Sequence, residues 1–373
     1  MHPNEYSHFW RHDDLAERFP KLAEWEDEGA RLRPTLKQLE DFAKATHAPI
    51  GYLFLQEPPV EHVPIPDFRT IANRRVERPS PDLLDTIYLC QQRQEWYHHF
   101  MRGTRGERLA FIGSATTDSD VIAAAEAMRT TLGFNVAERR DCPTWADALR
   151  RFLERADAIG VLVMVNGVVG SNTHRKLDPQ EFRGFALSDD LAPLVFINGA
   201  DTKSAQMFTL AHELAHLWLG QSALSNVEPF STPTQHVENW CNRVAAEFLV
   251  PLTAFREVYQ AGEALNDALA RLSRQFKVST LVILRRIHDA GGLTRDAFRR
   301  AYEAELQRLL ALQGGGGGGD FYLTLGARVG KRFARALVVS TLEGQTLHRD
   351  AFRLLGSSKH STFRELAHSL GVA

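Results

Sequence analysis

Two histidines and a glutamate stand in the segment TLAHELAHLWLG, residues 209–220, which is otherwise almost wholly apolar. Ionisable side chains are seldom buried unless they pair with another group or bind a metal ion. Because residues four apart lie on one face of a helix, His212 and His216 can point their imidazoles at a single point. The spacing therefore predicts that these two histidines bind one metal ion.

Glu213 directly follows the first of these histidines and stands at the flank of the same helix face. A catalytic zinc site uses three protein ligands and leaves the fourth position to water, with histidine nitrogens about 2.0 to 2.1 Å from the ion. A carboxylate at that flank can take a proton from the metal-bound water, so H-E-x-x-H predicts metal-dependent peptide hydrolysis with Glu213 as general base. The alternative is a pair of core histidines held by hydrogen bonds.

A third protein ligand is required, and the segment HVENWCNRVAAEFLV, residues 236–250, offers two glutamates. Glu238 is preferred because Asn242, four residues later, could hydrogen-bond the free ring nitrogen of a ligand histidine. This E-x-x-x-N spacing parallels the E-x-x-x-D arrangement of glutamate-liganded zincins. Glu247 is a weaker candidate near the helix end, and His236 is a lesser one because we expect it in a loop. The predicted Zn²⁺ ligands are His212, His216 and Glu238.

The elements that must position these residues can be placed from capping and periodicity. Asp201 can cap a helix that starts at Thr202, and Gly220 can end it. Before this helix, the runs VLVMV, FRGFALS and PLVFIN within residues 160–198 predict three short strands, which we expect to be antiparallel. After it, a second buried helix ends at Pro251. The predicted fold class is α+β, mostly helical, with a small sheet packed on the H-E-x-x-H helix as in zincins.

Composition shifts divide the rest of the chain into segments around this core. Short helices are predicted before the proline-rich connector LQEPPVEHVPIPDF, and six glycines, residues 314–319, separate a C-terminal helical piece. The predicted segments are a helical domain (1–60), a linker and helical lead-in (61–155), the zincin-like core (156–260), a helix-turn-helix-like segment (261–313) and a C-terminal helical domain (320–373).

Charge and cysteine content narrow the class of protein. Lys and Arg number 44 against 46 Asp and Glu, so no global positive field favours nucleic acid or an anionic membrane. Cys90, Cys142 and Cys241 lie far apart and form no C-x-x-C pair, which argues against disulfides and a cysteine-rich zinc knuckle. No segment reaches the roughly 18 apolar residues of a spanning helix, and the N-terminus lacks a signal-peptide pattern. We therefore expect a soluble, cytoplasmic protein.

The two segments FTLAHELAHLWLG and VENWCNRVAAEFLVP resemble the ImmA/IrrE family of bacterial metallo-endopeptidases over about residues 155–255. The resemblance implies a zinc enzyme in which His212, His216 and Glu238 bind the metal and Glu213 is the catalytic carboxylate. Members of this family characteristically cleave or inactivate an Xre-type helix-turn-helix repressor, or belong to a toxin-antitoxin or mobile-element module. The implied partner is thus an Xre-type repressor as protein substrate, or a cognate toxin.

The N-terminal helices are similar to the latter part of an Xre helix-turn-helix domain. The segment expected in the DNA major groove, KLAEWEDEG, carries four acidic residues against one lysine, which phosphates would repel. This favours a remnant domain for dimerisation or partner docking, with DNA binding through residues 11–55 as the alternative.

Residues 266–291 are also similar to a helix-turn-helix, and the alternative there is a helical support for the active site. Near the C-terminus, Arg328, Lys331, Arg332 and Arg335 recur at helical spacing and predict a solvated basic face, which an acidic partner could use.

Three hypotheses for function result. The preferred one is a zinc endopeptidase that cuts a specific protein. The second is an antitoxin that neutralises a toxin by binding, with an auxiliary zinc site, and the third is an Xre-like transcriptional regulator. The oxyanion-stabilising residue stays open among His174, Arg183 and His236.

Overall fold

The computed structural model describes residues 12–26, 33–46, 48–57, 59, 62–67, 70–71, 74–75, 79–225, 236–311 and 321–372. The chain divides into two compact units. The N-terminal unit comprises Met1–Pro64 with Val76–Ile87, and the core unit comprises Ile65–Arg75 with Tyr88–Ala373. The six glycines at 314–319 lie outside the described residues. Within the described part of the chain, no helix is long and apolar enough to cross a membrane.

The N-terminal unit contains the predicted short helices, which pack around a small apolar core. Thr35 and Gln38 form a capping box, in which the Thr35 N–H donates to Gln38 Oε1 at 2.8 Å and the Gln38 N–H donates back to Thr35 Oγ1. Of the acidic residues expected to repel phosphates, Asp27 and Glu28 lie outside the described residues. The elements of this unit are α1 (His12–Arg18), α2 (Leu22–Glu26), α3 (Leu36–Thr46), the short 3-10 helix η2 (Ile50–Phe54) and the first residues of α4 (Pro81–Gly103).

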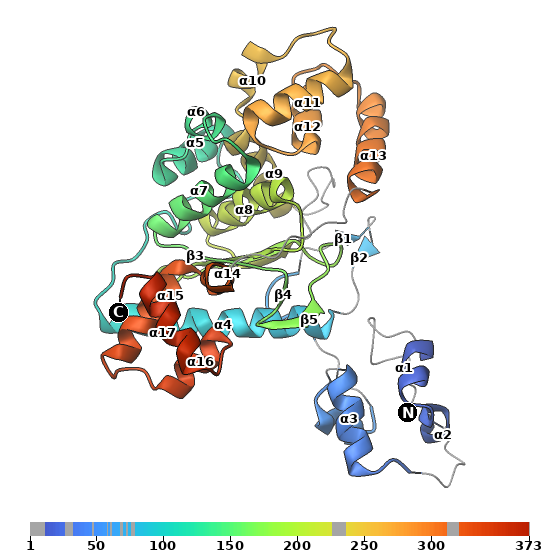
Figure 1. Ribbon diagram of the computed structural model, residues 1–373. Helices are drawn as coiled ribbons and strands as arrows, with labels where there is room; N and C mark the ends of the chain where they lie inside the picture. The colour runs from blue at the N-terminus through green and yellow to red at the C-terminus, as the bar shows by residue number, and fades with distance from the viewer. Residues whose placement is uncertain are drawn as a thin grey trace. The chain divides into compact units, whose positions relative to one another are not determined.

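The core unit contains a four-stranded mixed sheet (Figure 1). Its strands, in spatial order, are β3 (Leu162–Asn166), β7 (Leu194–Asn198), β6 (Gly184–Leu187) and β8 (Ala223–Ser225). Each of the three predicted runs forms a strand of this sheet, β3, β6 and β7, but the expected antiparallel arrangement is wrong for β3, which runs parallel to β7. The difference is topological: β7 enters the sheet between β3 and β6, and it runs antiparallel to β6 and parallel to β3. The fourth strand, β8, was not predicted.

Two further strand pairs belong to the core unit and lie outside the main sheet. They are the hairpin of β4 (Val168–Val169) with β5 (Asn172–Lys176), and the pair β1 (Thr70–Ile71) with β2 (Arg74–Arg75).

Both faces of the main sheet are covered. Successive side chains of a strand point to opposite faces, and in β7 Val195 and Ile197 join the apolar core that includes α8, whereas Phe196 stacks on Phe185 with ring centroids 5.0 Å apart. On the second face lies α4, where Gln94 Nε2 donates to the carbonyl of Leu187 at the end of β6 (Figure 1). The sheet thus lies between two helical layers.

The helices over the first face confirm the predicted helical segments (Figure 1). Among them, α8 packs against β6, β7, α7 and α9. Their bounds are α5 (Val121–Leu132), α6 (Val136–Arg140), α7 (Trp145–Ala158), α8 (Lys203–Trp218), α9 (His236–Leu249), α10 (Leu252–Val258), α11 (Leu265–Phe276), α12 (Thr280–Asp289) and α13 (Arg295–Ala311).

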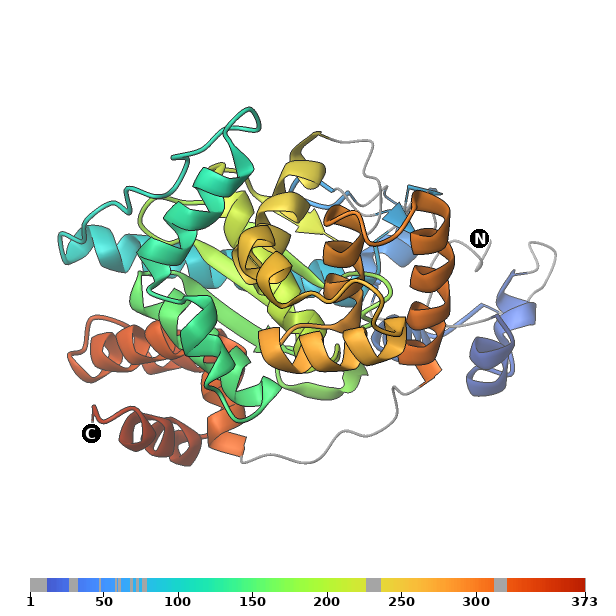
Figure 2. The same cartoon turned by 90° about the horizontal axis from the view of Figure 1, so that it is seen from above.

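The C-terminal helices pack beside β3 and α7 (Figures 1 and 2). The turn before α15 passes so close to β3 that a Cβ on Gly330, whose φ is +80°, would lie 2.8 Å from the Val163 carbonyl oxygen. Arg332 Nε donates to the carbonyl of Asp157 at the end of α7, at 2.8 Å. The predicted solvated basic face is therefore wrong for Arg332, because its guanidinium binds carbonyls that a helix terminus leaves unsatisfied. These helices are α14 (Phe321–Val329), α15 (Lys331–Leu342), α16 (His348–Leu355) and α17 (His360–Ser369).

Candidate metal centre

The helix that carries the H-E-x-x-H pattern is capped at its first turn and buried along most of its length. Thr202 is the N-cap, and its Oγ1 accepts from the Ala205 N–H. The predicted cap was one residue early, because Asp201 instead accepts the Thr202 N–H at 2.7 Å. At the other end, Gly220 has a φ of +67°, which suits a residue after a helix C-terminus.

His212, Glu213 and His216 are all fully buried on α8. Because α8 lies between the sheet, α7 and α9, every one of its faces is covered from the second turn onward. These three ionisable side chains are therefore held inside the protein, as their apolar neighbours in the sequence suggested.

Glu238, in the first turn of α9, meets the two histidines. Its carboxylate lies 3.3 Å from His212 Nε2 and 2.9 Å from His216 Nε2, and the two Nε2 atoms are 3.0 Å apart. Tetrahedral coordination with bonds of about 2.0 to 2.1 Å separates ligand atoms by about 3.3 Å. The three side chains could therefore hold one metal ion.

The charges in this centre also favour a cation. Burial, and then the negative charge of Glu238, raise the pKa of Glu213 well above its usual range. Burial lowers the pKa of His216, which favours the neutral imidazole that binds metals. Among the described residues, neither Glu213 nor Glu238 has an ion pair with a lysine or arginine. A bound divalent cation would supply the charge that the chain does not.

Two residues that the sequence did not single out shape the space around Glu213. A Cβ on Gly184 would lie 2.6 Å from Thr209 Cγ2 and 3.3 Å from Glu213 Cγ, so only glycine lets β6 pass this close to α8. Across the sheet register, Gly184 pairs with the buried Ser225 of β8. The glycine inside FRGFALS was an available sequence signal for close backbone approach. The strand β8, in contrast, is too short to produce a recognisable strand pattern in the sequence.

The competing ligand candidates lie apart from the cluster. Glu247 pairs with Arg286 Nη2 at 2.7 Å and accepts the Leu252 N–H, so its carboxylate joins α9 to α12. His236 is exposed and begins α9, which corrects the expected loop at this position. The buried Asn242 Oδ1 has no hydrogen-bond partner among the described residues, and its bond to a ligand histidine stays a prediction.

The candidates for the oxyanion-stabilising residue differ in how near they lie to the candidate metal centre. Arg183 directly precedes Gly184, and its Nε is 3.7 Å from Asp201 Oδ2, at the N-terminal end of α8. His174 is exposed on β5. The described structure therefore gives neither His174 nor the exposed His236 a contact with the cluster.

Residues 156–288 match the family model Peptidase_M78, described as the IrrE N-terminal-like domain. The matched region holds the whole main sheet, α8, α9 and all four residues of the centre. The match supports a metallopeptidase-family function for this part of the chain. A second model, a domain of unknown function (DUF8813), matches residues 329–369. A search of curated proteins found no match.

The matched region, residues 156–288, ends with α11 and α12, the pair that resembles a helix-turn-helix. Ser279 caps α12, which confirms a turn between two helices. However, no residue of α12 is exposed, and six are buried. A recognition helix must present side chains to a DNA groove, so the burial of α12 favours the alternative, a helical support for α8 and α9.

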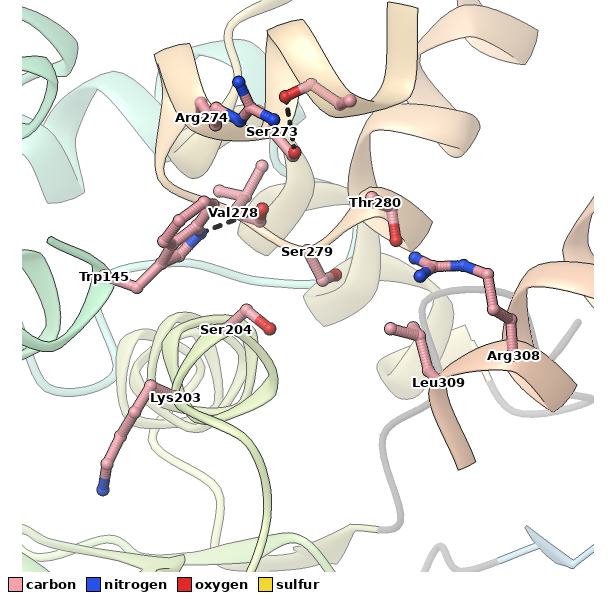
Figure 3. A pocket seen from close by; sticks show the side chains of 11 residues that line it. Trp145, Lys203, Ser204, Ser273, Arg274, Val278, Ser279, Thr280, Arg308 and Leu309 are labelled. Carbon is pink, nitrogen blue, oxygen red and sulfur yellow. Dashed lines mark hydrogen bonds between the residues drawn. The ribbon is translucent and has the colours of Figure 1, made fainter. Parts of the chain in front are cut away.

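A hollow of about 400 Å³ lies where this support meets the N-terminal end of α8 (Figure 3). Ser204 faces it from α8 and Ser279 from the turn, while the Lys203 amine points away. Arg308 at its rim is held by Glu305 at 2.6 Å. None of the residues of the candidate metal centre lines the hollow.

Proposed function

We propose that this protein is a zinc-dependent endopeptidase whose metal ligands are His212, His216 and Glu238. The observation that carries the proposal is the meeting of these three side chains within 3.3 Å of one another, buried beside the carboxyl of Glu213. The match of the surrounding region to the Peptidase_M78 model supports it.

A zinc ion bound there would polarise the peptide carbonyl and make water acidic enough to attack at neutral pH. Glu213 would take one proton from the attacking water as the new C–O bond forms. It would then return that proton to the nitrogen of the leaving amine as the C–N bond breaks. The burial of Glu213 excludes bulk water, so the proton would stay on its carboxyl group between the two steps.

The substrate we propose is one specific protein, an Xre-type repressor or a toxin-antitoxin partner. This part rests on the resemblance of the two helical segments to the ImmA/IrrE family. The alternative function is an antitoxin that binds a toxin, and the extra helices outside the matched region, in the N-terminal unit and at residues 329–369, favour it.

The test is zinc content together with processing of the product of a neighbouring gene, co-expressed with the full chain. We expect wild type and the control His368→Ala, an exposed histidine on α17, to hold one zinc and to process the partner. His212→Ala should lose zinc, and Glu213→Gln should keep zinc while processing falls about 10²- to 10⁴-fold. Stoichiometric zinc in His212→Ala would refute the ligand set, and unchanged processing in Glu213→Gln would refute the mechanism. Toxin neutralisation that survives Glu213→Gln would favour the antitoxin.

A further inference from the structure

Leu224 forms the outer edge of β8, and the next residue, Ser225, lies on the side of β8 toward β6 and Glu213. Ser225, the last residue of β8, pairs with Gly184, where a Cβ would lie 3.3 Å from Glu213 Cγ, and the Ser225 carbonyl accepts the Arg183 N–H on the β6 side at 3.3 Å. Because backbone groups of neighbouring strand residues point to opposite sides, the Leu224 backbone faces away from β6. An extended peptide that pairs with Leu224 would therefore run past Glu213.

This edge is already paired with a segment of the same chain. The Leu224 N–H donates to the carbonyl of Pro66 at 2.9 Å, and Asp67 forms a parallel bridge with Leu224. Ile65, just before them, is 9% exposed, so its side chain is packed inside the protein. Residues Ile65–Arg75 group with the core unit, although the chain on both sides of them belongs to the N-terminal unit.

The attachment is short for a strand. Pro66 has no N–H, so it cannot continue the ladder toward the start of β8. The described contacts of the segment with β8 are this one bridge and its hydrogen bond. A peptide that forms a longer ladder along the same edge would gain more backbone hydrogen bonds and could displace it.

We propose that Ile65–Asp67 is an internal competitor, which occupies the edge of β8 where the extended segment of a protein substrate binds. The site then opens when this segment leaves β8. The inference rests on the proposed function for its link to catalysis, because Ser225 at this edge pairs with Gly184, which lies beside Glu213. The occupied edge itself is independent of any metal.

The first experiment measures the edge directly, with a fluorescently labelled peptide HVPIPDFRTI, residues 62–71, added to the full chain. Ile65→Asp should release the internal segment, and Ile122→Asp is the matched control because Ile122 is 58% exposed on α5. We expect the peptide to bind Ile65→Asp about tenfold or more tightly than wild type or the control, since an occupied site lowers apparent affinity. Equal affinity for all three proteins would overturn the proposal.

Hydrogen exchange at the Leu224 amide provides a second readout. We expect exchange about tenfold or more faster in Ile65→Asp, and protection restored by the added peptide. Protection that persists in Ile65→Asp without peptide would show that Pro66 does not hold this amide, and would also overturn the proposal. Should Ile65→Asp fail to fold, Ile65→Ser with Ile122→Ser gives the same comparison.

A third measurement separates this inference from the proposed function. Acetohydroxamate needs only a zinc ion, so it should bind zinc-loaded wild type and Ile65→Asp alike, whereas a blocked trialanine hydroxamate should bind Ile65→Asp about tenfold more tightly. If neither hydroxamate binds while the labelled peptide still discriminates, the zinc site fails and the internal competitor stands. If acetohydroxamate binds but the labelled peptide does not discriminate, the zinc site stands and the competitor is refuted.

Discussion

The two ends of α9 each bury a glutamate, and they satisfy its charge in different ways. At the C-terminal end, Glu247 meets the guanidinium of Arg286 and a backbone N–H from Leu252. At the N-terminal end, the ion-pair partners of Glu238 among the described residues are the imidazoles of His212 and His216. A buried carboxylate needs a partner charge. The chain supplies that charge for Glu247, whereas for Glu238 it supplies two histidine nitrogens that, together with the carboxylate, could hold one metal ion.

The largest effect on stability is expected at the Glu247 end. Arg286→Met would leave the Glu247 carboxylate buried without its cation, and should lower the free energy of unfolding by about 3 to 5 kcal/mol, with or without zinc. Urea denaturation measures this. Arg285→Met is the control, because that neighbouring arginine pairs with Asp289 near the surface and is worth at most about 1 kcal/mol. Equal losses in the two variants would remove the contrast between a buried and a surface pair.

The Glu238 end should respond to zinc instead. At free zinc of about 100 times its dissociation constant, binding should add about 2.7 kcal/mol to the free energy of unfolding, and a chelator should remove this gain. Glu238→Gln should lose most of the gain, because a carboxamide is a poor zinc ligand. The exposed variant Glu257→Gln should keep it. If zinc stabilised Glu238→Gln as much as wild type, the two ends of α9 would not differ as we describe.

The smallest effect tests the close packing around Glu213. In Gly184→Ala the new methyl group would lie 2.6 Å from Thr209 Cγ2 and 2.8 Å from the Phe196 carbonyl oxygen, so β6 or α8 must shift. We expect a loss of about 1 to 3 kcal/mol in thermal or urea unfolding. Gly103→Ala, where nothing lies within 4 Å, should change stability by less than about 1 kcal/mol. A tolerated Gly184→Ala would mean that the space beside Glu213 is less tightly defined than the distances indicate.

The residues of the centre could be predicted because their signal is local. The four-residue spacing of His212 and His216 places both on one helix face, and the first-turn cap and Gly220 delimit that helix. Hydrophobic periodicity likewise predicted α9 and the helices around it. Such patterns depend on hydrogen bonds and side-chain spacing within one element, so the amino-acid sequence determines them without the rest of the fold.

The choice between Glu238 and Glu247 was different, since both stand on the same helix and both are buried. Sequence spacing favoured Glu238, but only the crossing of α9 over α8 brings it to the histidines and brings Glu247 to Arg286. The parallel pairing of β3 with β7, the short strand β8 and the docking of Ile65–Asp67 on its edge were also invisible in the sequence. These contacts join residues far apart in the chain, and their free energy comes from shared burial that no single segment encodes.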